Sequence, residues 1–540
     1  MPPHGSLCIF CGKRIQEDAM LCVSLLPFPL TGGIFIFNSN TTGKLKPLKF
    51  NIIDSPMGIG KSVSLIDFIR FHPKGKGAGA TRFIVFVPTI RERDERFAIE
   101  LDFKSPETPP YHKSIIEMIR KGDNIVTTHA LWSIFNDNTL RAFRESKYKY
   151  IACFDEVPPL FRDVVGAGRN LDSIVDIVRF GHEDVKLMQK ENLLINENGV
   201  LRYNAKCDYA KADKGYKIFN AVKKLSYSCT LYPYGDKDGL FTSIIAFQKR
   251  ALFECFSQCW FFSYLTWESM LYTYCHMFHI DMEYYQIVDR RIMRNPEGRY
   301  IATYPDGIEN LVILDDKRFN MDENLSKAWY DRAGKDITQA GLKKLKRQFR
   351  NAYGFMKAHG VRSETFLFTV FTAYKDMLDS NGRYYPSLKR FLPCNTKATN
   401  DYSNCTGVAY LCNRYFDVTC VNFLKQRAKA ENDPKLAFHN DVYALSELVQ
   451  FIWRSNVRVK DAKQPVYVWV PGKRMRKLLK EFLQQAFKRK TEDMMLHLSR
   501  KERRITPGGK RKLTHLLTRK YNPIFGYVRY RFFRFTVKDD

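Results

Sequence analysis

The sequence predicts an α/β protein whose parallel sheets carry helices on both faces. Apolar, strand-like runs such as 49–55, 82–88 and 148–156 alternate with amphipathic stretches, as expected of strand–helix–strand units. A second alternating set extends from 364–371 to 465–472. Hydrophobic residues make up 45% and charged residues 27% of the 540 residues, which is typical of a folded globular chain and not of a disordered one. We therefore expect two α/β blocks.

The segments around these blocks set the expected domain limits. Residues 1–40 form a short segment that contains cysteines, and residues 165–245 are polar and weakly periodic, which predicts an insertion in the first block. We expect one domain at 41–310 and a second at 311–475. A basic, aromatic extension is expected at 476–540.

The charge of the chain favours a polyanionic partner. Its 87 Lys and Arg outnumber its 57 Asp and Glu, which gives a net charge of +30. Residues 471–540 carry 21 Lys and Arg against 6 Asp and Glu, and 529–535 alternate cations with aromatic rings. Cations neutralise phosphates and rings stack on unpaired bases, so this tail suits a single nucleic-acid strand. A charged helix followed by an ordinary amphipathic strand is the alternative.

Cysteine usage indicates a reducing, intracellular compartment. The 13 cysteines are an odd number, and the chain does not start with a secretory signal pattern, so a secreted disulfide framework is not expected. No membrane association is expected either. Cys8, Cys11 and Cys22, with His4, could hold Zn²⁺, but a second ligand pair is missing and free thiols are the favoured interpretation.

The sharpest motif follows the first strand-like run and precedes a helical pattern. It consists of Ser55, Pro56, Met57, Gly58, Ile59, Gly60, Lys61 and Ser62. Small residues let backbone N–H groups face phosphate oxygens, Lys61 reaches the β- and γ-phosphates, and Ser62 offers a hydroxyl to Mg²⁺. Ser55 stands where the usual pattern has glycine. We expect this segment to bind ATP and Mg²⁺.

Two adjacent carboxylates, Asp155 and Glu156, end the run 148–156. In P-loop NTPases an Asp in this place holds Mg²⁺, and a neighbouring Glu can polarise the attacking water. An acidic strand-to-loop junction is common by itself. Together with the upstream loop, we expect Asp155 to hold the metal and Glu156 to act in catalysis.

Over residues 45–475 these motifs resemble superfamily 2 DExD/H-box helicases, especially the divergent viral, phage and origin-binding-protein type. The resemblance implies an α/β fold with two RecA-like P-loop domains. It also implies that segments after the first loop touch the bound strand, namely Pro88, Thr89, Arg91, Thr127, Thr128, Thr399 and Asn400. Thr266 is similar in place to the residue that couples hydrolysis to strand movement.

Late in the chain, residues 450–458 resemble the family's arginine motif, with Gln450, Arg454 and Arg458. Trp453 replaces its usual glycine, and the last arginine comes one residue late. An arginine supplied by a second domain can stabilise charge on the γ-phosphate, so we expect catalytic roles for these residues and for Lys61. A solvated basic helix face is the alternative.

These observations predict an ATP-dependent helicase or translocase. The resemblance implies replication or recombination of a viral or mobile element, single-stranded or forked DNA as substrate, and replication proteins as further partners. An RNA helicase of the same architecture and a nucleic-acid-binding protein with a degenerate ATPase remain alternatives. A packaging motor would need a carboxylate cluster after the ATPase, and the acids of the tail are scattered.

Overall fold

A computed structural model describes most of the chain between residues 47 and 501. The described ranges are 47–107, 109–166, 178–211, 216–237, 240–295, 305–378, 386–394, 396, 401–459 and 461–501, with side chains described up to residue 490. The predicted zinc ligands Cys8, Cys11 and Cys22, and the basic tail beyond residue 501, lie outside these ranges. The cysteines inside them are free thiols.

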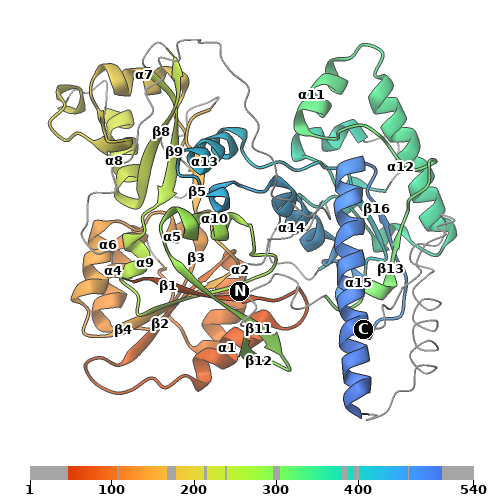
Figure 1. Ribbon diagram of the computed structural model, residues 1–540, viewed down its shortest axis with the longest axis horizontal. Coiled ribbons are helices and arrows are strands. Elements are labelled where there is room, and N and C mark those ends of the chain that lie inside the picture. Colours follow the sequence, from red (N-terminus) through yellow and green to blue (C-terminus); the bar gives the residue numbers. More distant parts are fainter. Residues whose placement is uncertain are drawn as a thin grey trace, which may run out of the picture.

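The first lobe is built on a seven-stranded sheet in the order β12-β11-β1-β10-β4-β2-β3 (Figure 1). Its strands are β1 Lys49–Asp54, β2 Thr81–Val87, β3 Ile125–Thr128, β4 Lys149–Asp155, β10 Gln258–Ser263, β11 Asp281–Val288 and β12 Arg291–Arg294. All neighbours pair in parallel except β11 and β12. The central strands are almost entirely buried, as expected of a parallel sheet covered on both faces.

Helices cover both faces of this sheet. Their bounds are α1 Lys61–Phe71, α2 Ile90–Glu92, the π-helical η1 Arg93–Ala98, α3 Ile99–Leu101, α4 Tyr111–Lys121, α5 His129–Trp132, α6 Asp137–Glu145, α9 Ala251–Glu254 and α10 Met270–Met277. Apolar residues of α1 and η1 pack on one face, and those of α4, α5, α6, α9 and α10 pack on the other. The predicted α/β arrangement with helices on both faces is therefore present.

Between β4 and β10 the chain forms a separate, antiparallel unit in the order β5-β9-β8-β7-β6. Its elements are β5 Phe161–Asp163, α7 His182–Lys190, β6 Leu194–Glu197, β7 Val200–Tyr203, η2 Asp208–Lys211, α8 Tyr216–Ser228, β8 Cys229–Lys237 and β9 Leu240–Gln248. Apolar residues of α7, α8 and these strands form a core of their own. The unit occupies the region in which the sequence predicts an insertion.

The second lobe carries a four-stranded parallel sheet in the order β13-β16-β15-β14. Its strands are β13 Leu311–Ile313, β14 Phe366–Thr369, β15 Gly407–Tyr410 and β16 Val466–Trp469. Its helices are η4 Ile308–Asn310, α11 Lys327–Lys335, α12 Ala340–Ala358, η5 Ser363–Thr365, η6 Thr372–Leu378, η7 Leu388–Arg390, α14 Asn440–Ile452, η9 Asn456–Arg458 and α15 Lys473–Lys501. One apolar cluster involves α11 and α12, and another involves α14 and α15.

The two lobes also share a core away from the sheet edges. The segment between β15 and α14, with α13 Val418–Ala430 and η8 Pro434–Leu436, leaves the second lobe and packs beside β5, β9 and α10 (Figure 1). Phe423 on α13 contacts the rings of Tyr232, Tyr234 and Phe247. Late residues therefore complete the first lobe's hydrophobic core.

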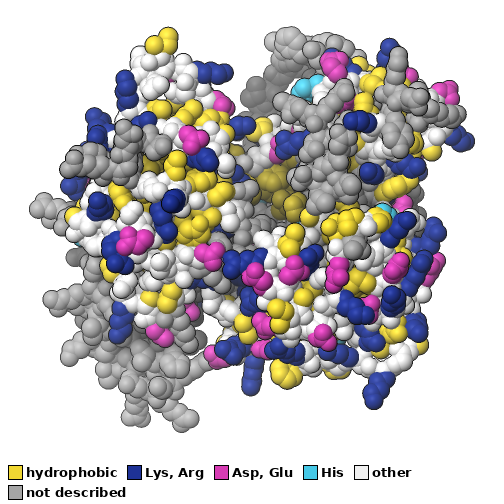
Figure 2. Space-filling view, turned by 180° about the vertical axis from the view of Figure 1, so that it is seen from behind, with side chains coloured by type: hydrophobic (Ala, Val, Ile, Leu, Met, Phe, Trp, Pro, Cys, Tyr) yellow, Lys and Arg dark blue, Asp and Glu magenta, His cyan; other side chains and the backbone are white. Residues whose placement is uncertain are grey.

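Among the described residues, no helix combines the length and apolar character needed to cross a bilayer. On the face that Figure 2 shows, Lys and Arg side chains are interspersed with Asp and Glu over both lobes. The high net charge is thus not gathered into one patch among the described residues of this face.

Phe423→Ala is expected to destabilise the protein by roughly 3–5 kcal/mol, because it removes a ring that is 6% exposed and leaves a cavity between the lobes. Urea unfolding followed by fluorescence and circular dichroism measures this change. Phe71, which is 83% exposed, provides the control, since Phe71→Ala should change stability by less than about 0.5 kcal/mol. Equal effects of the two substitutions would contradict the proposed packing role of α13.

Candidate functional site

The Gly-bearing loop connects β1 to α1 at the carboxyl edge of the first sheet. Gly58 and Gly60 have φ of 87° and 89°, a region that L side chains rarely adopt, and Gly60 precedes the first residue of α1. The ammonium of Lys61 donates to the carbonyl oxygens of Ser55 at 2.8 Å and Pro56 at 3.0 Å. The loop therefore curls around Lys61 at a helix N-terminus, where backbone N–H groups favour anions.

Ser55, the departure from the usual glycine, has a structural role. Its side chain is fully buried, and its hydroxyl accepts a hydrogen bond from the backbone N–H of Ile287 at 2.9 Å. Its own N–H donates to the carbonyl oxygen of Ser263 at 2.9 Å. Ser55 thus fixes the start of the loop to β11 and to the end of β10.

The two predicted carboxylates lie directly beside this loop. The hydroxyl of Ser62 donates to Oδ2 of Asp155 at 3.0 Å, which joins the start of α1 to the end of β4. Glu156 follows with φ of 65°, and its N–H donates to the carbonyl oxygen of Phe262 at 3.0 Å. A non-glycine residue in this region carries strain, and such strain clusters at functional sites.

The donor set at this position suits Mg²⁺. A serine hydroxyl and a carboxylate are hard oxygen ligands, and Mg²⁺ in phosphate-transfer sites is held by one or two such groups together with phosphates. Ser62 and Asp155 are the residues that would hold the ion. No group of three or more His, Cys, Asp or Glu that could form an all-protein metal site occurs among the described residues.

A second residue set faces the loop from the other lobe. Gln450 and Trp453 lie at the C-terminal end of α14, Arg454 follows them, and Arg458 lies in η9. Together with the loop and the two carboxylates, they line a cleft of about 450 Å³. Met57 and the segment around Tyr264 also pack against the core of the second lobe. The structure therefore brings the early loop and the late arginines together.

Burial shapes the chemistry of both arginines. Arg454 is 7% exposed, and its Nη1 has no hydrogen-bond partner among the described residues. Burial lowers the pKa of Arg454, and the nearby Glu156 carboxylate opposes this shift. Burial also lowers the pKa of Arg458. A buried donor without a partner is costly, so Arg454 is suited to receive an anionic oxygen.

Trp453 explains why glycine is absent from this motif. Its ring is almost fully buried in the core of the second lobe, and its Nε1 donates to the carbonyl oxygen of Asp306 at 3.1 Å. A glycine here would leave a large cavity.

The residues predicted to touch nucleic acid have mixed placements. Pro88 and Thr89 follow β2, and the Thr89 hydroxyl accepts from the N–H of Glu92 at 3.2 Å to cap α2. Thr128 caps α5 in the same way at 3.4 Å, and Thr127 is fully buried in β3. Thr399 and Asn400 lie outside the described residues.

Arg91 lines the cleft and forms an ion pair with Asp401 of the second lobe at 3.3 Å and another with Glu95 at 2.8 Å. Thr266 donates through its hydroxyl to Asp54 at 2.7 Å, and Asp54 immediately precedes the loop. Burial raises the pKa of Asp54 to about 6.

The sequence analysis missed several residues that line the cleft. These are Glu92, Glu95, Arg96 and Asp401. The dense charged run from Arg91 to Arg96, directly after a buried strand, was the available signal.

Comparison with known proteins places the second lobe in a described domain type. Residues 306–483 match the YonV C-terminal Rossmann-like domain. The chain is also 25% identical, over 458 residues, to the SPbeta prophage-derived uncharacterized protein YonV of Bacillus subtilis (strain 168). That similarity covers 81% of this chain and 99% of the relative. The protein is therefore a mixed α/β protein with parallel-strand sheets and a Rossmann-like domain, and the matched domain contributes Gln450, Arg454 and Arg458 to the cleft.

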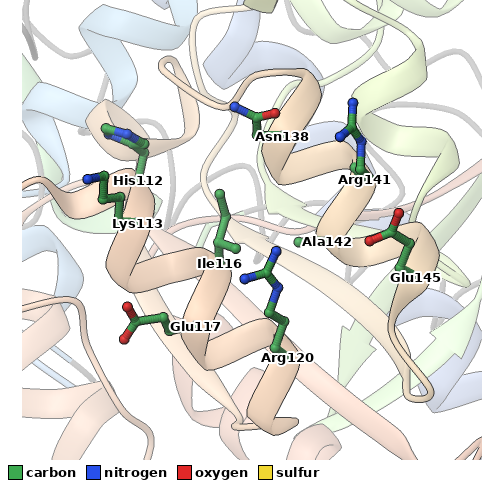
Figure 3. A pocket seen from close by; sticks show the side chains of 9 residues that line it. All are labelled: His112, Lys113, Ile116, Glu117, Arg120, Asn138, Arg141, Ala142 and Glu145. Carbon is green, nitrogen blue, oxygen red and sulfur yellow. The ribbon is translucent and has the colours of Figure 1, made fainter.

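A second hollow, of about 350 Å³, lies between α4 and α6 on the first lobe (Figure 3). α4 contributes Lys113, Glu117 and Arg120, and α6 contributes Arg141 and Glu145. Charges of both signs alternate around it, and none of the residues predicted from the sequence lines it. The cleft between the lobes is therefore the candidate site.

Ser55→Gly, although it restores the usual motif, is expected to destabilise the protein by about 1–3 kcal/mol, because the buried N–H of Ile287 loses its acceptor. Thermal and urea unfolding measure the effect, and Ser55→Ala should behave alike. Replacing the exposed Ser363 by Ala is the control. A stabilising effect of Ser55→Gly would show that the hydroxyl has no structural role.

The sequence predicts that this loop binds Mg-ATP, and on that prediction the affinity should fall as the pH rises above about 8. Burial lowers the pKa of Lys61 to about 8, with Asp155, Glu156 and Asp54 opposing the shift and Arg458 adding to it. Phosphate binds the protonated ammonium, so Kd should rise about tenfold per pH unit above that pKa.

Calorimetric titration between pH 7 and 9.5 measures this profile. Lys61→Arg keeps its charge throughout and should give a flatter profile. A wild-type Kd that stays constant up to pH 9.5 would refute the assignment of Lys61 to the phosphates.

Proposed function

We propose that this protein is an ATP-dependent nucleic-acid helicase or translocase of the superfamily 2 type, with two RecA-like lobes that close on ATP. One observation carries the proposal. The cleft unites Lys61, Ser62 and Asp155 of the first sheet with Arg454 and Arg458 of the second lobe, although some 300 residues separate the two groups in the sequence.

Each group has a role that its environment supports. Lys61 and the N–H groups of the loop hold the phosphates, and Ser62 and Asp155 hold Mg²⁺, which neutralises charge on the phosphate oxygens. Glu156 accepts a proton from the attacking water. Arg454 and Arg458 stabilise charge that develops on the γ-phosphate. ATP and water thus give ADP and phosphate.

The electrostatics of the cleft fit this assignment. Burial raises the pKa of Asp155 to about 6, and the adjacent Glu156 contributes to the shift, while Lys61 opposes it. Asp155 is therefore mostly ionised at neutral pH and can hold a cation. Mg²⁺ would lie beside the carboxylates, and the phosphates of ATP would lie beside the lysine and the arginines, so each charge that enters the cleft meets the opposite sign.

Nucleic acid is the partner that the charge of the chain supports best. A net charge of +30 favours a polyanion, and the relative is named as prophage-derived, which fits replication or recombination of a mobile element. We propose DNA, single-stranded or forked, as the substrate. Opening and closing of the lobes with each ATP would move a strand that both lobes contact.

Lys61→Ala is expected to abolish nucleotide binding and hydrolysis. Glu156→Gln should retain Mg-ATP binding but lower kcat by roughly 10²–10⁴-fold, because it removes the proton acceptor. Steady-state ATPase assays with single-stranded DNA, forked DNA, duplex DNA and RNA measure both the turnover and its stimulation. The expected result is the greatest stimulation by single-stranded or forked DNA.

The matched controls are Lys76→Ala and Glu145→Gln, since both residues are exposed and lie outside the cleft. Greater stimulation by RNA would make the protein an RNA helicase. ATP binding without turnover on any polymer would leave a nucleic-acid-binding protein with a degenerate ATPase. Full activity of Lys61→Ala would refute the site itself.

A further inference from the structure

Arg96 lies in the cleft, although the sequence motifs give it no role. It belongs to η1, the π-helical segment Arg93–Ala98 that follows β2 and α2, and π-helical turns often occur at functional sites. Its side chain is 32% exposed, and its ion pair with Glu100 spans 3.8 Å, beyond hydrogen-bond distance. The guanidinium is therefore partly buried but weakly held.

Arg96 lines the same cleft as Asp155 of the first lobe and Arg458 of the second. Burial and Glu156 raise the pKa of Asp155, and the positive charge of Arg96 opposes this rise as a minor cause. After burial, Arg96 also contributes to the lowered pKa of Arg458. Arg96 thus acts electrostatically both on Asp155, at the end of β4 in the first lobe, and on Arg458 in the second lobe. Two guanidinium groups that approach across a cleft repel each other unless an anion lies between them.

An anion bound between Arg96 and Arg458 would carry several negative charges, because further cationic groups line the same cleft. Lys61 already lies at the base of the loop, and Arg454 has a buried nitrogen without a hydrogen-bond partner among the described residues. The backbone of η9 also closes over the loop, since a Cβ on Gly58 would lie 3.6 Å from the carbonyl oxygen of Arg458. The backbone of the late arginine is thus held at the loop, and Arg96 lines the same cleft from the first lobe.

We propose that Arg96 binds the terminal phosphate of a nucleoside triphosphate opposite Arg458, so that the protein distinguishes ATP from ADP by the charge this phosphate places between the two lobes. The inference rests on the proposed function and adds a specificity-determining residue to it. ATP joins Arg96 of the first lobe to Arg458 of the second through its terminal phosphate, which ADP lacks.

The test is the affinity for Mg-ATP and for Mg-ADP, measured by calorimetry on the full chain. In Arg96→Gln, the Kd for Mg-ATP should rise roughly tenfold or more, the effect of losing a charge-assisted hydrogen bond, while the Kd for Mg-ADP should change less than about twofold. Arg96→Lys keeps the charge and should restore part of the preference.

Arg93→Gln is the matched control, because Arg93 lies in the same π-helical segment but is paired with Asp94 at 2.6 Å. It should leave both affinities unchanged. Small-angle X-ray scattering provides a second readout. Mg-ATP should compact the wild-type protein more than Mg-ADP does, and Arg96→Gln should lose that difference.

The outcomes separate the two proposals. If the wild-type protein binds neither nucleotide, the proposed function fails. If it binds both through Lys61 but Arg96→Gln keeps the wild-type preference for ATP, only the role of Arg96 is overturned. An equal loss of both nucleotides in Arg96→Gln and Arg96→Lys would also overturn it, since Arg96 would then support the fold of the cleft and not read the terminal phosphate.

Discussion

The parallel pairing of β1, β10 and β4 is the constraint on which the rest of the site depends. Asp54 pairs with Ser263, and Phe262 pairs with Asp155, so the three strands end at one level. The chain can therefore place the loop after β1, the turn after β10 and the acids after β4 at a single edge. Two backbone bonds, from Ser55 and Glu156 to the end of β10, extend this pairing past the strands.

The turn after β10 links this edge to the second lobe. Leu265 and Thr266 donate their backbone N–H groups to the Asp54 carboxylate at 2.9 Å and 3.1 Å. Tyr264 packs edge-on near Phe482 of α15. A change in the position of the loop would therefore alter contacts with the second lobe through these packed side chains and hydrogen bonds, as well as across the cleft. Such contiguous contacts can couple two structural units.

The sequence was enough to predict the α/β class, because alternating strand and helix patterns are local. Buried strands such as β2 and β4 are continuous apolar runs, and the positive φ of Gly58 and Gly60 agrees with the tight loop that their small size predicts. The role of Ser55 could not be predicted, since its partner Ile287 is 232 residues away. The same holds for Asp401, whose position in the cleft depends on the approach of the two lobes.

The segment between β15 and α14, which contains α13, prevents the chain from being divided into two independent halves. Phe423, Leu424 and Phe438 of the later half pack in the hydrophobic core of the first lobe. Phe50 and Phe154 belong to the same core, so residues from both halves fill it. A fragment that stops before residue 306 would expose an unfilled hydrophobic surface and would tend to aggregate. The two halves therefore share one hydrophobic core and are expected to unfold together.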